Sequence, residues 1–228
     1  MHFFLPKPLH GWRAFLGEVG IIVLGVLIAL GAEQVVEALH WRAEMNGERQ
    51  ALYSEARENI GSVRWRQRLQ PCIDARLAQL DAILHAHAVG RTIALQRPVG
   101  RPVTSFMSNT AWQVALSSQA VSHMSLTQKL AFARAFSSYE NLDQALQREQ
   151  DAWLKLGVLD DPALLSEGDW PALRQAYAEA ATLNTRIKLI TRHVLSVGTL
   201  GQGSKESFEG TPGAKEAATE FCQPIVSE

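Results

Sequence analysis

The sequence has only two cysteines, Cys72 and Cys222, which lie far apart in the chain. It contains no CxxC pair, so neither a thioredoxin-like redox site nor a cysteine-rich zinc site is indicated. In an oxidising compartment an even pair of cysteines is typical of a disulfide, and we expect a Cys72–Cys222 bond. Two unrelated buried thiols are the alternative. A bond closing so long a loop would stabilise the fold by about 4–5 kcal/mol through chain entropy.

The chain also lacks the short motifs of common catalytic sites. It has no HExxH, no GxSxG, no phosphate-binding lysine loop and no EF-hand loop. His85 and His87 are two residues apart, so on a helix they point about 200° apart and do not easily share a metal ion. We therefore expect a protein that is not an enzyme and has no catalytic, cofactor-binding or metal-ligating residues.

The chain also lacks an excess of charge of either sign. The formal net charge is −1, and no long run of either sign is present. A nucleic-acid-binding protein would normally show a basic face, so we expect no nucleic-acid partner. No β-strand pattern competes with the helical periodicity, and no internal repeat is evident. The expected fold class is all-α.

One long apolar run stands out. Phe15–Ala32 (FLGEVGIIVLGVLIALGA) contains a single ionisable residue, Glu18. A helix needs roughly 17–25 mostly apolar residues to cross a bilayer, so we expect a transmembrane helix over residues 12–34. Trp12 and Trp41 bracket the run, roughly 43 Å apart along a helix. Tryptophan favours both membrane–water interfaces, which makes this pair the expected interface anchors.

Flanking charge indicates the orientation. Lys7, Arg13 and the terminal amine precede the run, whereas glutamates predominate after it. By the positive-inside rule, residues 1–11 form a short cytoplasmic N-terminus and the rest lies outside a bacterial inner membrane. The opposite orientation is one alternative, because the charge bias is small. A cleaved secretory signal is another, but the helical pattern continues past the small residues that would mark its cleavage site.

The N-terminal residues resemble a known anchor. The residues Phe15 to Glu18, the apolar run Ile21 to Leu30, and then Glu33 and Trp41 are similar to the anchor of uncharacterised bacterial single-span membrane proteins. The resemblance is clearest over roughly the first 45 residues. It implies a topology and no catalytic residues.

Small residues recur on one face of the expected span, and we expect this face to pack against another membrane helix. Gly25 and Ala29 form a variant of the pattern that lets membrane helices approach closely. Glu18 flanks the face, where it can hydrogen-bond a partner or a second copy; alternatively it only reaches the headgroups. The expected packing residues are Gly17, Glu18, Gly25, Ala29 and Ala32.

Residues 35–200 are expected to form a periplasmic, antiparallel bundle of about five helices. Pro71 should end the helix that leaves the span, because the residue before a proline is pushed out of the α region. A second helix is expected over residues 72–88, and the irregular segment 91–107 should pack over the domain. Helix caps at Ser108 or Asn109 and at Ser125 predict where two later helices begin. Two apolar stripes predict buried helix faces. The first stripe comprises Phe132, Phe136, Tyr139, Leu142, Leu146 and Trp153, and the second comprises Leu173, Tyr177, Ala180, Leu183, Ile187, Ile190, Val194 and Val197.

The last stretch, residues 201–228, is rich in glycine and poor in apolar residues. We expect an irregular tail there, which the Cys72–Cys222 bond would pin across the start of the second helix.

Two functions fit this organisation. The favoured one is a membrane-anchored helical protein that binds other membrane or envelope proteins, or itself, beside the lipid bilayer. The alternative is an ion-motive or sensory subunit that uses Glu18 within the span. Its layout is similar to the energising or peptidoglycan-binding subunits of proton-driven machines, although no matching outer domain is evident and the acidic residue there is usually Asp. A signalling role would lack room for a cytoplasmic module.

Overall fold

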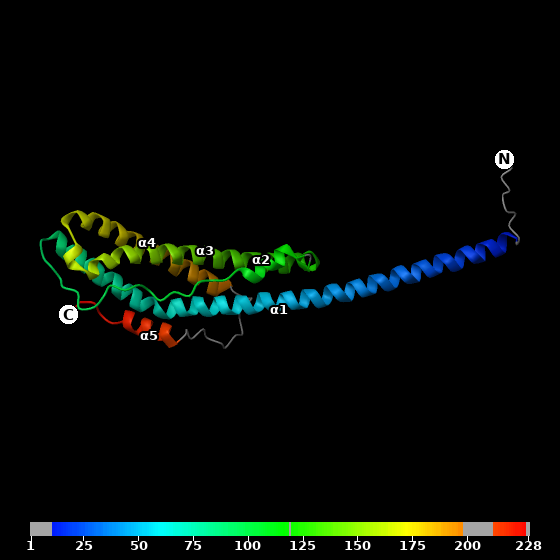
Figure 1. Cartoon of the computed structure of the whole chain (residues 1–228), viewed down its shortest axis with the longest axis horizontal. Helices are drawn as coiled ribbons and strands as arrows, with labels where there is room; N and C mark the ends of the chain where they lie inside the picture. The colour runs from blue at the N-terminus through cyan, green and yellow to red at the C-terminus, as the bar shows by residue number, and fades with distance from the viewer. Residues whose placement is uncertain (1–10, 119, 198–211, 227–228) are drawn as a thin grey trace, which may run out of the picture. The chain divides into compact units, whose positions relative to one another are not determined.

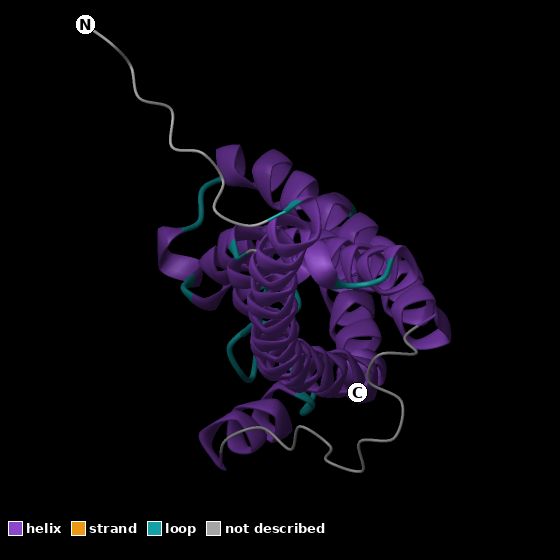
Figure 2. Cartoon of the chain, turned by 90° about the vertical axis from the view of Figure 1, so that its right-hand side faces the viewer, coloured by secondary structure: helices purple, strands orange, loops and turns teal. Residues whose placement is uncertain are grey.

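The computed structural model describes residues 11–118, 120–197 and 212–226. Within these ranges every regular element is a helix and none is a strand, which confirms the all-α prediction (Figures 1 and 2). The α-helices are α1 (Trp12–Ala88), α2 (Thr110–Ser117), α3 (Leu126–Leu156), α4 (Trp170–Val197) and α5 (Pro212–Phe221). Short 3-10 helices lie at η1 (Ala120–His123), η2 (Gly157–Asp160), η3 (Pro162–Leu164) and η4 (Glu167–Asp169).

The chain forms two compact units, Met1–Glu48 and Arg49–Glu228. We call the second unit the helical domain. The boundary between the two units, after Glu48, lies later in the chain than residue 34, where the expected span ends. The reason is that α1 has no buried side chain between residues 15 and 51, and Leu52 is the first core residue.

The predicted break at Pro71 is wrong, because α1 continues through it to Ala88. Proline inside a helix removes one backbone hydrogen bond and crowds the preceding turn, at a cost of about 3 kcal/mol. Here the helix buries Leu69 and Ile73 on either side of Pro71, and this packing outweighs the local preference. Figure 1 shows α1 changing direction in its cyan-to-teal part.

The C-terminal end of α1 lies at Ala88, where the sequence predicts that a helix ends. The chain leaves the helix after Ala88 and turns at Gly90, whose φ of 73° is a left-handed conformation that glycine adopts without strain. The amide of Arg91 donates to the carbonyl of Ala86 at 2.8 Å, which satisfies one of the last free carbonyls of the helix.

The core of the helical domain lies between α1, α3 and α4, and α3 and α4 lie side by side (Figure 1). The predicted α3 stripe is confirmed, because all six of its members are buried. The predicted α4 stripe is buried at Leu173, Ala180, Leu183, Ile187 and Val194, and Tyr177 and Ile190 are half-buried. The side chain of Val197 lies outside the described residues.

Local signals fix where α3 and α4 begin. Ser125 accepts a hydrogen bond from the amide of Gln128, and the Gln128 side chain accepts from the amide of Ser125, as the capping-box pattern predicts. Pro171 lies in the first turn of α4, where a missing amide hydrogen is tolerated. The predicted cap of α2 is placed correctly at Asn109, but the Asn109 side chain makes no capping hydrogen bond.

The irregular segment between α1 and α2 packs over the domain, as predicted. Val99 is fully buried, and Ile93, Leu95 and Val103 pack against the core. The predicted irregular tail, in contrast, is wrong for residues 212–221, which form α5. Ala218, Phe221 and Ile225 are buried in the same core, and this contact stabilises a helix that its glycine-rich surroundings did not indicate. We call residues 212–226 the C-terminal strap. Residues 201–211, 227 and 228 lie outside the described residues.

Candidate functional site

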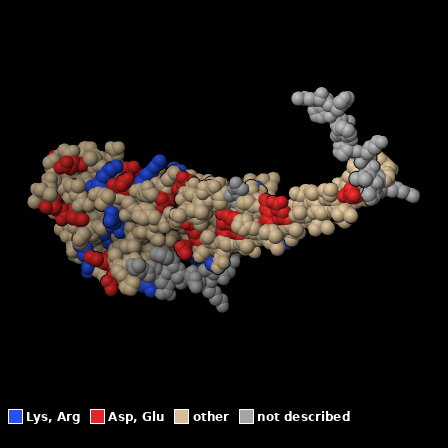
Figure 3. Space-filling model, turned by 45° about the vertical axis from the view of Figure 1, so that its right-hand side comes forward, with Lys and Arg blue, Asp and Glu red and all other residues tan. Residues whose placement is uncertain are grey.

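The first part of α1 contains the predicted span. Near its N-terminus α1 is long and apolar enough to cross a membrane, with a mean hydropathy of 2.4 over its most apolar window. None of that window is buried within the protein. Figure 3 shows a length of α1 with almost no charged side chains, whereas the helical domain carries charges of both signs. Isolated apolar surface of this extent needs a lipid or protein environment.

The predicted packing face is open. Glu18, Gly25, Ala29 and Ala32 are exposed, and so is Gly17. A methyl group added at Gly17 or Gly25 would meet nothing within 4 Å. Small residues with free space above them are the arrangement that lets a second membrane helix approach closely.

The two predicted anchors lie at either end of this stretch. Trp12 is 73% exposed, and its ring centroid lies 6.3 Å from that of Phe15. Trp41 is half-buried and donates through its indole nitrogen to Glu37 at 3.3 Å. Both rings therefore lie on the surface of α1, and Trp41 already has a polar partner of the kind that an interfacial tryptophan uses.

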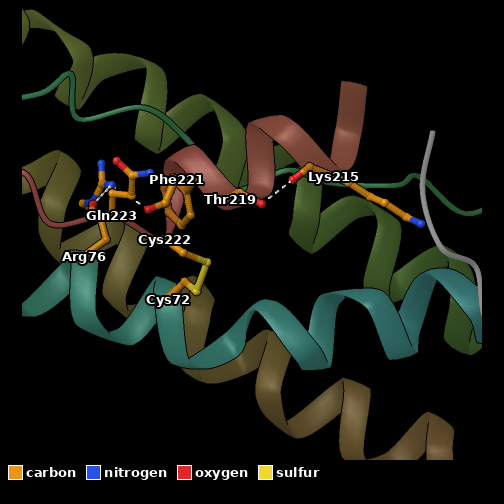
Figure 4. The surroundings of a disulfide bond; sticks show 7 residues. All are labelled: Cys72, Arg76, Lys215, Thr219, Phe221, Cys222 and Gln223. Atoms are coloured by element: carbon orange, nitrogen blue, oxygen red, sulfur yellow. Dashed lines mark hydrogen bonds between the residues drawn. A yellow bond between two sulfur atoms is a disulfide. The ribbon is translucent and has the colours of Figure 1, made fainter. Parts of the chain in front are cut away.

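The predicted cysteine pair is brought together. Cys72 and Cys222 lie at disulfide-bonding distance, with their Cα atoms 4.8 Å apart across 150 residues of chain (Figure 4). The bond joins α1 to the residue that follows α5. The bond was expected to pin the tail across the start of a second helix at residue 72; the described part of the tail is joined there, although residue 72 lies inside α1 and begins no separate helix.

One helical turn beyond Cys72, Arg76 ties three segments together, a role that the sequence analysis did not predict. Its guanidinium donates to the carbonyls of Pro98 and Val99 in the irregular segment, and to those of Phe221 and Gln223 in the C-terminal strap, the last two at 2.6 and 2.8 Å (Figure 4). Arg76 is only 3% exposed, and burial lowers its pKa, while nearby Asp160 opposes that shift. The arginine thus donates hydrogen bonds to buried backbone carbonyls that are not paired within the regular pattern of a helix.

A groove of about 740 Å³ opens beside Arg76. The irregular segment, α3 and the C-terminal strap form its walls. Arg97 and Arg101 line it together with Asp151 and Glu220, and Phe106 and Leu154 add exposed apolar surface. Charges of both signs give the groove no single electrostatic preference.

A buried polar network crosses the centre of the domain. Arg66 donates to Glu149 of α3 at 2.8 Å and to Asn184 of α4 at 3.1 Å. Burial lowers the pKa of Arg66 and raises that of Glu149, and the ion pair between them opposes both shifts. A charged pair placed among apolar neighbours fixes which helices meet and at which level, rather than offering a reactive group to solvent.

Sequence reasoning missed these arginines, although a signal was present. Arg66 and Arg76 lie three residues after Val63 and Ile73, on the apolar stripe of α1, and Glu149 lies between Leu146 and Trp153 on the stripe of α3. A charge at a core position indicates a buried partner. The partners come from distant segments, so the pattern does not name them.

Among the described residues, no group of three or more His, Cys, Asp or Glu side chains is arranged to hold a metal ion. His87 instead stacks on Trp170 with ring centroids 3.6 Å apart. Comparison of the chain with protein-family models, with curated proteins and with solved structures found no match. The candidate site is therefore defined by its own geometry: the open apolar face of α1 and the C-terminal strap held by Cys72 and Arg76.

Proposed function

We propose that the chain is a single-span membrane protein, not an enzyme, that associates through its span with other envelope proteins or with a second copy of itself. The apolar run of α1 crosses the inner membrane with residues 1–11 in the cytoplasm. The helical domain, an antiparallel bundle, lies on the periplasmic side.

The observation that carries this proposal is the unburied apolar window of α1 with open space above its glycines. In a bilayer the apolar residues face lipid without penalty, so hydrophobicity alone does not drive association there. Close packing of small residues and interhelical hydrogen bonds do. Gly17, Gly25 and Ala29 supply the first, and Glu18 supplies a donor or acceptor for the second.

The helical domain supports a binding role rather than catalysis. Its two most buried charges, Arg66 and Glu149, pair with each other in the core. The groove beside Arg76 is lined by charges of both signs and is open to solvent. The ion pair joins α1 to α3 in the core, and the groove presents exposed apolar side chains ringed by charged ones, as an interface with a polar rim does.

The test compares two glycines in the same span. Gly25 lies on the small-residue face, whereas Gly20 lies about 120° around the helix from the centre of that face. Both have open space above them, so leucine fits at either position in the isolated chain. The full chain, purified in detergent, is analysed by sedimentation and by identification of copurifying proteins.

We expect an oligomer or a discrete partner for the natural chain. Gly25→Leu should abolish that association and Gly20→Leu should preserve it. A monomer without a partner would contradict the proposal, and so would equal effects of the two substitutions.

A further inference from the structure

The two cysteines of the disulfide differ in their access to solvent. Cys222 is exposed, whereas Cys72 is half-buried on α1. A shallow groove of about 540 Å³ reaches Cys222 and is lined also by Trp65, Arg68, Lys215 and Thr219. A thiol that approaches from solvent therefore meets the sulfur of Cys222 first, because nucleophilic attack on a disulfide needs access to one sulfur along the bond.

Two arginines of α1 lie close to the disulfide. Arg68 and Arg76 lie four residues before and four residues after Cys72 on α1. Arg68 also lines the groove that reaches Cys222, and Arg76 donates to the carbonyls of Phe221 and Gln223, on either side of Cys222. Arg76 is the buried arginine that holds the C-terminal strap, and Arg68 stacks over Trp65 with its Cζ 5.5 Å from the ring centroid. Positive charge beside a disulfide stabilises whichever thiolate departs, so the arginines favour the exchange and the access of Cys222 to solvent selects the attacked sulfur.

We propose that Cys222 is a thiol–disulfide exchange site, at which a small thiol or a dithiol protein attacks and from which Cys72 departs as the thiolate. This inference goes beyond the proposed function and does not depend on the span. In the first step the incoming thiolate forms a bond to Sγ of Cys222. The Sγ–Sγ bond breaks, and its electron pair leaves with Cys72.

The product of the first step is a mixed disulfide on Cys222. The second thiolate of a dithiol reductant then attacks the reductant's first sulfur in the mixed disulfide, and Cys222 leaves as the thiolate. Two electrons have then passed from the dithiol to the protein, and the reductant has become a disulfide. With a monothiol the second step needs a second thiol molecule, so brief exposure followed by blocking leaves the mixed disulfide on the sulfur that was attacked.

The experiment exposes the oxidised full chain to glutathione for short times, blocks free thiols with N-ethylmaleimide at low pH, and maps both cysteines by mass spectrometry. We expect glutathione on Cys222 and the alkyl group on Cys72, with at least about tenfold preference over the reverse pattern. Glutathione on Cys72, or an even distribution, would overturn the proposal. Reaction only after unfolding in urea would overturn it as well.

A second arm tests the leaving group. Arg68→Gln removes one cation beside the disulfide and should slow the first step by about twofold to fivefold, because the departing thiolate loses a stabilising charge. Arg57→Gln is the matched control, an exposed arginine of α1 far from the disulfide, and should leave the rate unchanged. Equal rates for Arg68→Gln and the natural chain would show that Arg68 does not direct the exchange, and would contradict the charge argument.

Discussion

Arg66 of α1 and Glu149 of α3 form an ion pair with a nitrogen–oxygen distance of 2.8 Å, and their side chains are only 3% and 0% exposed. Such a pair contributes little net stability compared with apolar residues of the same volume, because both charges lose their hydration. Removing only one of the two charges is strongly destabilising, because the remaining charge stays buried without its partner.

Glu149→Gln should therefore lower the free energy of unfolding by about 3–5 kcal/mol. The double substitution Arg66→Met with Glu149→Leu removes both charges and should recover about half of that loss or more. Urea unfolding of the full chain in a mild detergent, followed by circular dichroism, measures both values. A loss below about 1 kcal/mol in Glu149→Gln would show that the pair is not buried as described.

Tyr139 gives a prediction for alkaline pH. Its hydroxyl is buried without a hydrogen-bond partner among the described residues, and burial raises its pKa to about 12. The folded state therefore holds the phenol proton more tightly than the unfolded state, whose tyrosine pKa is about 10. As pH rises from about 10 to about 12, this residue makes the free energy of unfolding fall, by at most about 2.7 kcal/mol.

Tyr139→Phe should remove that alkaline loss and, near neutral pH, stabilise the fold by about 1 kcal/mol, because an unsatisfied buried hydroxyl is gone. Unfolding curves for both chains at several pH values test this. Parallel pH profiles for the two chains would be inconsistent with a buried phenol at this position.

The C-terminal strap is held to α1 by the disulfide, by Arg76 and by a hydrogen bond from the Ile225 amide to the Gln79 side chain. A helix of the length of α5 does not persist alone in water. Reduction of the disulfide in Arg76→Met should therefore speed hydrogen exchange at residues 212–226 far more than reduction of the natural chain does. The α3 and α4 amides should change much less. Uniform acceleration across the domain would mean instead that the strap and the bundle unfold as one unit.

Ser125 caps α3 through its side chain, so Ser125→Ala should lower the free energy of unfolding by about 1 kcal/mol. Ser137→Ala is the control, because Ser137 is exposed in the interior of the same helix and alanine favours helices there. Thermal or urea unfolding measures the change in the free energy of unfolding for each variant. The two changes should differ in sign, or at least clearly in size. If both substitutions were equally harmless, the cap would have no energetic role.

Much of the fold was predictable because it follows from local patterns. The stripe from Phe132 to Trp153 and the stripe from Leu173 to Val194 each predict one buried helix face, and the Ser125 cap predicts where α3 begins. The Cys72–Cys222 bond was predictable because the chain offers no other cysteine. These signals lie within one helix, or within one pair, and need no knowledge of neighbouring elements.

The remainder depends on contacts between distant segments. Pro71 stays helical because Leu69 and Ile73 are both buried, and α5 forms because Phe221 reaches the core beside Trp153, with ring centroids 5.8 Å apart. Arg76 finds its carbonyl partners 22 to 147 residues away along the chain. A local pattern shows that a charge or a proline stands at an unusual position, but only packing decides what compensates for it.

The membrane claim is tested most directly by fractionating cells that express the full, untagged chain, with an alkaline carbonate wash of the membranes. The account predicts that the chain remains in the washed membrane pellet at its full mass of 25.1 kDa and is released only by detergent. Recovery of the full-mass chain in the aqueous fraction, without detergent, would contradict it.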